Sequence, residues 1–166
     1  MKDFAGTPGT FTSLALRISQ CIFAAGSITA MATTSNFFNF TAFCYLIASM
    51  GLQVIWSFGL ALLDAYALIR KKVLHNSILV SLFVVGDWVT CTLSLAAASA
   101  SAGITMLLFH DVGHCNYYNE CQKYQMSVAL AFLSWITLSV SSLIMLWLLS
   151  AGFLVFVFLR MIRSEI

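Results

Sequence analysis

Charged residues are scarce in this chain. They make up 8% of its 166 residues, whereas a soluble domain usually carries about 25%. Hydrophobic residues make up 61%, so too little polar surface remains to cover a water-soluble globule. Proline is scarce too, since Pro8 is the only one and precedes the first long apolar run. These shortages exclude an ordinary soluble domain and indicate a membrane protein.

Recognisable catalytic motifs are also missing. The sequence contains no HExxH zinc motif, no glycine-rich phosphate loop and no Ser/His/Asp arrangement that stands out. The three histidines, His75, His110 and His114, all fall in expected loops. We therefore expect no enzymatic activity, no cofactor and no metal, and nothing in the sequence indicates a nucleic-acid partner.

Four runs with few charges are each long enough to cross a bilayer, which takes about 20 helical residues. They cover residues 13–34, 42–69, 77–109 and 125–159. Helices are expected, because a backbone in lipid must satisfy its own hydrogen bonds, and no alternating β-barrel pattern is evident. The sequence predicts an all-α membrane protein in which residues 1–166 form a single four-helix bundle, without internal repeats or linkers.

Basic residues predict the orientation of this bundle. With four spans, six of the eight Lys and Arg residues fall on one side: Lys2, Arg70, Lys71, Lys72, Arg160 and Arg163. Lys123 falls on the opposite side and Arg17 lies within the first span. The positive-inside rule then places both termini in the cytoplasm. Two loops, residues 33–40 and 110–123, are expected to face outward.

Three ionisable residues lie within the predicted spans. At about 1.5 Å of helical rise per residue, Arg17 lies about 6 Å from the cytoplasmic end, Asp64 about 9 Å and Asp87 about 15 Å. Charges at such depth seldom occur without a partner or a function. Arg17 and Asp87 are expected to form an interhelical pair, because a guanidinium suits a carboxylate.

Other interpretations of these charges stay open at this point. Arg17 could instead extend its charged head to the cytoplasmic surface. Asp64 is expected to pair with the nearby basic link at residues 70–72. Asp64 and Asp87 could also line a polar path for protons or ions, which would make the protein a channel or transporter.

Small residues cluster in the outer half of the third span. Ala96 and Ala100 share one helical face, as do Ser99 and Gly103. Small side chains let helix backbones approach closely in lipid. The pattern predicts tight packing, either within the bundle or between copies.

The outer loops hold candidate modification sites. Cys115 and Cys121 lie in the second outer loop, where an oxidising compartment favours a disulfide. A zinc site that adds His110 and His114 is the alternative, but the spacing does not match a common zinc motif. Asn39 begins a glycosylation sequon, which abuts the second span and is therefore expected to stay unused.

Long stretches of the chain resemble one family. "GTPGTFTSLALRISQCIFA" (6–24), "FCYLIASMGLQVIWSFGLALLDAYAL" (43–68) and "HNSILVSLFVVGDWVTCTLSLAAASASAG" (75–103) resemble the plant Casparian strip membrane domain (CASP-like) proteins, most closely their fifth subgroup. The family has four membrane helices with cytoplasmic termini and is related to the MARVEL four-helix proteins. Its characteristic arginine in the first helix and aspartate in the third correspond to Arg17 and Asp87.

The resemblance implies a function. The best-known members form immobile plasma-membrane platforms that recruit wall-modifying enzymes for local lignin deposition. We therefore expect a non-enzymatic plasma-membrane scaffold that forms homo-oligomers, and hetero-oligomers with relatives, in contact with membrane lipids and secreted wall-modifying enzymes. Strip-forming members carry a distinctive first outer loop rich in Thr, Leu, Pro and Phe. This chain has "TTSNFFNFT" there, which favours the wider CASP-like group over a strip-forming role.

Overall fold

A computed structural model describes residues 10–34, 37–70, 77–110 and 118–164 of the chain. Its long helices are α1 (Phe11–Ala32), α2 (Thr41–Arg70), α3 (Ser77–His110) and α4 (Tyr118–Ser164). A short 3-10 turn, η1 (Phe37–Asn39), precedes α2, and the described residues contain no strand. All four long helices contain a stretch that is long and apolar enough to cross a membrane. The predicted all-α, four-helix membrane architecture is therefore confirmed.

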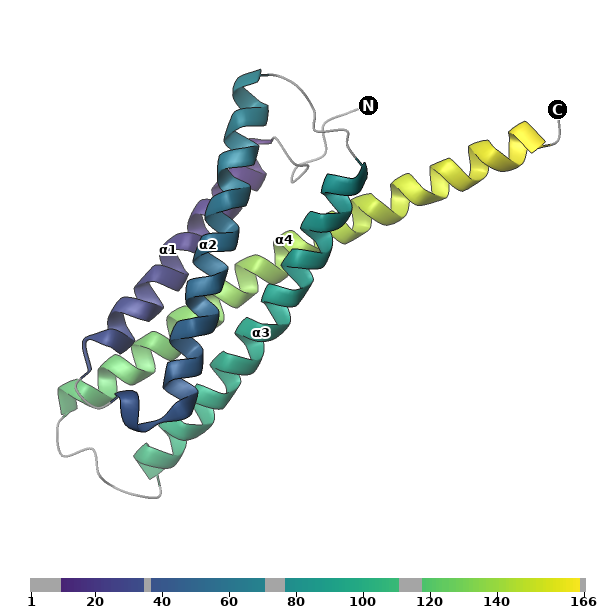
Figure 1. Ribbon diagram of the computed structural model, residues 1–166. Helices are drawn as coiled ribbons and strands as arrows, with labels where there is room; N and C mark the ends of the chain where they lie inside the picture. Colours follow the sequence, from purple (N-terminus) through teal and green to yellow (C-terminus); the bar gives the residue numbers. More distant parts are fainter. Residues whose placement is uncertain (1–9, 35–36, 71–76, 111–117, 165–166) are drawn as a thin grey trace.

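The four helices form an antiparallel bundle (Figure 1). The extensive contacts join α1 to α2 and to α4, and α3 to α2 and to α4. Each helix therefore has two close neighbours, and α1 and α3 lie on one diagonal while α2 and α4 lie on the other. The start of α1 and the end of α4 lie at the same end of the bundle (Figure 1).

Hydrogen bonds to residues at its two ends help to explain where α1 begins and ends. At its start, the Thr10 hydroxyl accepts a hydrogen bond from the Ser13 backbone N–H at 3.4 Å, which satisfies one of the unpaired donors of the first turn. At its far end, Lys123 Nζ donates to the Thr33 carbonyl at 3.3 Å. A cation is favourable there because the C-terminal end of a helix carries partial negative charge.

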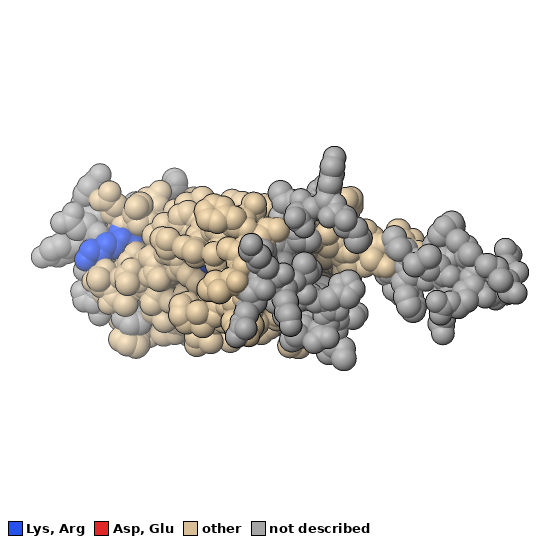
Figure 2. Space-filling model, turned by 90° about the horizontal axis from the view of Figure 1, so that it is seen from above, with Lys and Arg blue, Asp and Glu red and all other residues tan. Residues whose placement is uncertain are grey.

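The residues that point into the bundle recur at a regular helical spacing, but many of them are polar. In α1 the buried residues recur every three or four positions, as expected for one helical face: Ser13, Arg17, Gln20, Ala24, Ser27 and Met31. Across the described chain, more of the buried side chains are polar or charged than apolar. The outer surface is apolar in turn. The described residues seen in Figure 2 are mostly uncharged, with basic atoms at one end and a small basic spot near the middle of the bundle. This arrangement suits a protein whose solvent is lipid.

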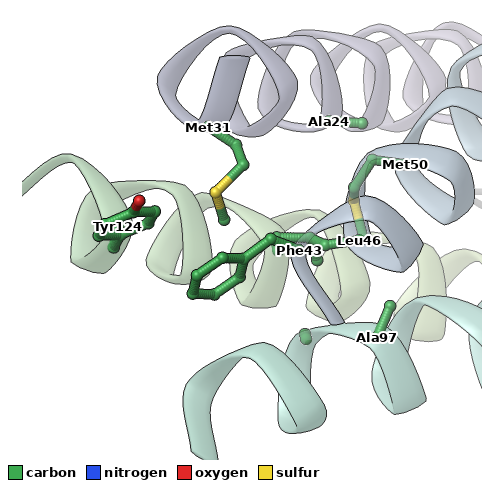
Figure 3. Close-up of a cluster of buried hydrophobic side chains, with 9 residues drawn as sticks. Ala24, Met31, Phe43, Leu46, Met50, Ala97 and Tyr124 are labelled. Atoms are coloured by element: carbon green, nitrogen blue, oxygen red, sulfur yellow. The ribbon is translucent and has the colours of Figure 1, made fainter. Parts of the chain in front are cut away.

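Apolar packing is concentrated at one end of the bundle, which we call the aromatic end. Phe43 stacks on Tyr124 with ring centroids 4.8 Å apart and meets Phe40 edge-on at 5.4 Å. Figure 3 shows Met31 beside Phe43, with Ala97 of α3 facing α2. Most of the polar and charged groups described below lie in the remainder of the interior, beside further buried apolar residues such as Leu60, Phe83 and Leu138.

Candidate functional site

The half of the bundle away from the aromatic end contains a fully buried ion pair. Arg17 Nη1 donates to Asp87 Oδ1 at 2.8 Å, and Arg17 Nη2 donates to Asp87 Oδ2 at 2.6 Å. The side chains of Arg17 and Asp87 are 1% and 0% exposed. Two parallel bonds between a guanidinium and a carboxylate are the strongest arrangement that such a pair can adopt. The structure thus brings together the two charged residues that were predicted from the sequence to form an interhelical pair.

Trp56 of α2 is the third member of this site, and sequence reasoning missed it. Its indole Nε1 donates to Asp87 Oδ1 at 2.9 Å. Asp87 Oδ1 therefore accepts two hydrogen bonds and Oδ2 accepts one, so both oxygens of the buried carboxylate are occupied. These three bonds supply the partners that burial would otherwise deny to the carboxylate oxygens.

Gly86 makes the position of Trp56 possible. A Cβ placed on Gly86 would lie 2.0 Å from Trp56 Cζ2 and 2.5 Å from Cη2. The indole therefore lies directly against the α3 backbone, where no larger residue leaves room for it. The neighbouring residues Gly86 and Asp87 act together, one by admitting the ring and the other by accepting its N–H.

The ion pair joins the two helices on one diagonal. Arg17 belongs to α1 and Asp87 to α3, while the extensive helix contacts run along the sides of the bundle. Its bonds therefore cross the middle of the bundle and set the register of helices that share little other contact. Among the described residues, none forms a hydrogen bond with the buried Arg17 Nε atom, and an ordered water is the usual partner for such a group.

Asp64 lies eight residues after Trp56, nearer the C-terminal end of α2, and is 5% exposed. It accepts a hydrogen bond from the Ser13 hydroxyl of α1 at 2.7 Å. The predicted partner, the basic link at 70–72, lies outside the described side chains. In the described chain the Ser13 bond ties the first turn of α1 to the last third of α2.

A set of glutamine and serine side chains extends the polar interior from the ion pair toward the aromatic end. Gln20 Oε1 accepts a hydrogen bond from the Ser57 hydroxyl at 3.1 Å, and Gln20 Nε2 donates to the Thr137 carbonyl at 3.2 Å. Gln53 Nε2 donates to the Ser134 hydroxyl at 2.7 Å, which links α2 to α4 across the second diagonal. Both diagonals of the bundle are thus closed by buried polar side chains.

Two serines bring α1 and α4 into close contact near the aromatic end. The Ser27 hydroxyl donates to the Ser127 carbonyl at 2.9 Å, and the Ser127 hydroxyl donates to the Ser27 carbonyl at 2.8 Å. Such a reciprocal arrangement requires small side chains on both helices, as close packing in membranes generally does.

We expect Ser27→Leu to destabilise the bundle more than Ser27→Ala does. The alanine removes one interhelical bond, worth about 0.6 kcal/mol in membrane proteins, whereas the leucine also forces the helices apart, at about 1–3 kcal/mol. Thermal unfolding in detergent measures the difference. Thr29→Leu, an exposed position on the same helix, is the matched control and should unfold like the wild type. Equal stability of both Ser27 variants would contradict this account.

The sequence of this bundle matches a known protein family. Residues 6–137 match the Casparian strip membrane protein domain. The chain belongs to the Casparian strip membrane protein family. It is 70% identical over 92% of its length to CASP-like protein 5B3 of Arabidopsis thaliana, which it covers completely. No solved structure matches the chain.

Other relatives of this CASP-like chain come from further plant species. Identity is 58% with CASP-like protein 5B3 of Oryza sativa subsp. indica, over 91% of this chain and 99% of the relative. It is also 58% with CASP-like protein 5B1 of Picea sitchensis, over 90% of this chain and 81% of the relative. These names agree with the fifth subgroup to which the sequence was assigned.

The four small residues of α3 that were expected to pack closely lie on the outside of the bundle and not in its interior. The outer surface of the CASP-like bundle exposes Ala96, Ser99, Ala100 and Gly103, whereas Ala97, Ala98 and Ser101 are the buried residues of this stretch. The expectation of packing within the bundle is therefore wrong for the four exposed residues. The cause is register, because α3 is small on all sides here and Asp87 fixes which side turns inward. Packing between copies stays a prediction.

Cys115 and His114 of the second outer loop lie outside the described residues. Cys121 belongs to α4 and His110 to α3, but their side chains are not described. The disulfide between Cys115 and Cys121 therefore stays a prediction. Helix α4 begins at Tyr118, so part of the stretch expected as loop is helical. Asn39 is exposed and belongs to η1, immediately before α2.

A groove on the outer surface between α3 and α4 has a volume of about 410 Å³. Thr92 is the one polar residue among those that line it, and its hydroxyl bonds to its own helix through the Trp88 and Val89 carbonyls. The other lining residues are Val84, Val85, Trp88, Val89 and Leu146. The groove therefore lacks the polar groups that a catalytic site requires.

Proposed function

We propose that this family member is a non-enzymatic, multi-pass scaffold of the plasma membrane that oligomerises and organises a membrane domain. In this proposal both termini face the cytoplasm, as the charge distribution predicts. The observation that supports it best is the Arg17–Asp87–Trp56 site, in which every bond is internal and both carboxylate oxygens are occupied. These bonds make the bundle rigid, and a scaffold needs a rigid building unit.

The same geometry weighs against the channel alternative. An acid that lines an ion or proton path must be reachable by the ion, yet Asp87 is 0% exposed and holds three donors. Asp64 is also buried and accepts from Ser13. A current through the reconstituted protein that disappears in Asp87→Asn would overturn the scaffold proposal and establish the channel.

Lateral association in this proposal uses the exposed face of α3. Its four small residues form a strip along the outer surface where another helix backbone can approach closely. Homo-oligomers and hetero-oligomers with related family members form through such faces, and the outer loops recruit secreted wall-modifying enzymes. The relatives are named CASP-like proteins, so the proposal extends to this chain what its resemblance to that family implies.

A matched pair of glycine variants tests the interface. A Cβ on Gly103 of α3 or on Gly59 of α2 meets no atom within 4 Å, so both Gly103→Leu and Gly59→Leu should fold. We expect Gly103→Leu to lower the cross-linked oligomer fraction in native membranes about tenfold, the effect of about 1.4 kcal/mol. Gly59→Leu should leave that fraction unchanged.

The possible results distinguish an error in the proposed α3 interface from an error in the scaffold proposal itself. Loss of oligomers only in Gly59→Leu would move the interface to α2. Monomers of the wild-type protein that diffuse freely in the plasma membrane, measured by fluorescence recovery after photobleaching, would contradict the scaffold itself.

A further inference from the structure

Helix α4 is too long for the bundle that it belongs to. It has 47 residues, or about 70 Å at the usual helical rise, whereas the 22 residues of α1 extend about 33 Å, close to the thickness of the hydrocarbon core. In Figure 1 α4 crosses the other helices obliquely and its last part leads away from α1, α2 and α3. Met145 is the last buried residue among those described in α4. The segment beyond Gly152 therefore leaves the bundle.

The composition of this segment indicates a lipid environment. Residues 151–159 read AGFLVFVFL, with no polar side chain on any side of the helix. A helix that is apolar all round belongs in a membrane or a protein core, because water would leave it without a favourable surface. Leu154 and Met161, whose side chains are described, are 68% and 62% exposed within the chain. Within the part of the chain that the structure describes, no core covers them, and a bilayer would supply the apolar surroundings that they need.

A steep tilt explains how the segment can stay in lipid. The uncharged run of α4 extends from Tyr124 to Leu159, which is 36 residues or about 54 Å of helix. A hydrophobic stretch longer than the hydrocarbon thickness of about 30 Å is accommodated by tilting. The oblique path of α4 in Figure 1 agrees with this. The end of the helix then lies to one side of the bundle.

Two arginines mark where the uncharged run ends. Arg160 and Arg163 are three positions apart in α4, so they share one face of the helix. Glu165 is the one acid that follows them in the sequence. Basic residues next to a membrane segment attract anionic headgroups, at about 1 kcal/mol for each Lys or Arg. We propose that α4 beyond Gly152 is a membrane-embedded arm whose arginines, Arg160 and Arg163, bind the headgroups of anionic phospholipids.

Photo-crosslinking tests what surrounds the arm. Benzoylphenylalanine replaces Leu154 in one variant and Met161 in another, in nanodiscs that contain equal parts of phosphatidylcholine and phosphatidylglycerol. The control replaces Leu143, which is 63% exposed on the part of α4 inside the bundle, and should give lipid adducts. We expect lipid adducts at both arm positions too. Cross-linked dimers at Leu154 would overturn the proposal in favour of a second copy, and an absence of adducts would place the arm in water.

The charge requirement is tested separately. At position 161, the ratio of phosphatidylglycerol to phosphatidylcholine adducts should fall about fivefold for each arginine removed in Arg160→Gln and Arg163→Gln. Lys123→Gln removes a cation from the opposite end of α4 and should leave the ratio unchanged. Native mass spectrometry of co-purified lipids gives the same comparison on the wild type and the double glutamine variant, without the photo-label. A ratio that is the same in all of these proteins would overturn the role of the arginines.

Discussion

Asp87→Asn lowers the free energy of unfolding by about 3–5 kcal/mol, the usual cost of removing one partner of a buried ion pair. The asparagine keeps the size of the side chain but leaves the Arg17 charge without a counter-ion at a position that is 1% exposed. Thermal unfolding in detergent, together with the fraction of protein that reaches the plasma membrane, measures the loss. Arg17→Leu should be similarly harmful, because it strands the carboxylate instead.

Replacing the whole site by apolar residues should recover most of this stability. Buried ion pairs exchanged for apolar residues of similar volume are often neutral or stabilising. The triple change Arg17→Met, Asp87→Leu and Trp56→Phe leaves no unpaired charge and no unpaired indole N–H. If the triple variant is no more stable than Asp87→Asn, the stability of the bundle depends on more than leaving no buried group unpaired. The interpretation of the pair as a purely structural tie would then be wrong.

Exchanging the two charges gives a third comparison. Arg17→Asp combined with Asp87→Arg restores opposite charges across the same diagonal, so expression should exceed that of each single variant. Recovery should be partial, because the Trp56 N–H, which now donates to Asp87 at 2.9 Å, would face a guanidinium that cannot accept. Single variants that behave like the wild type would remove any structural importance from the pair.

Gly86→Ala destabilises the bundle, although alanine is the better helix former. Its Cβ would lie 2.0 Å from Trp56 Cζ2, so the indole has to move and its bond to Asp87 is lost. Overpacking costs about 1–3 kcal/mol, and a hydrogen bond to a charged group contributes about 1.5–3 kcal/mol. Thermal unfolding should therefore show a clear decrease, and the quenching of Trp56 fluorescence should change.

Two controls separate the clash from the general effect of removing a glycine. Gly59→Ala has open space around its Cβ and should stabilise by up to about 1 kcal/mol, as alanine does in a helix interior. In a Trp56→Phe background, the shorter ring leaves room, so Gly86→Ala should cost little further. If Gly86→Ala and Gly59→Ala change stability in the same direction, the contact between Gly86 and Trp56 does not constrain the bundle.

The helices could be predicted from the sequence because membrane helices depend on local properties. Length and hydrophobicity along the chain indicated all four of them. The position of α4's start and its continuation to Ser164 were less accessible, because the residues around Tyr118 are polar and resemble a loop. Which face of each helix turns inward depends on all four helices together, and the small residues of α3 show how that choice escapes a single-helix analysis.

The site was predictable to a similar extent. Arg17 and Asp87 stand out because charges are rare in apolar spans, and their depths fall in the same half of the membrane. Trp56 does not stand out, since tryptophan is ordinary in such a helix and its role depends on the rotation of α2 relative to α3. The one available signal was Gly86 next to Asp87 in an otherwise bulky apolar stretch, which indicates close approach of another group.

The ion pair also sets an order of events during synthesis. Arg17 and Asp87 are 70 residues apart in the chain, so a ribosome that adds about 5–20 residues per second takes about 4–14 s to supply the second partner. Throughout that interval the Arg17 cation of α1 has no Asp87 carboxylate to pair with. The insertion machinery therefore has to shelter α1, or hold it at the cytoplasmic surface, until α3 emerges. Biogenesis of this protein is then most sensitive to conditions that delay translation between its first and third helices.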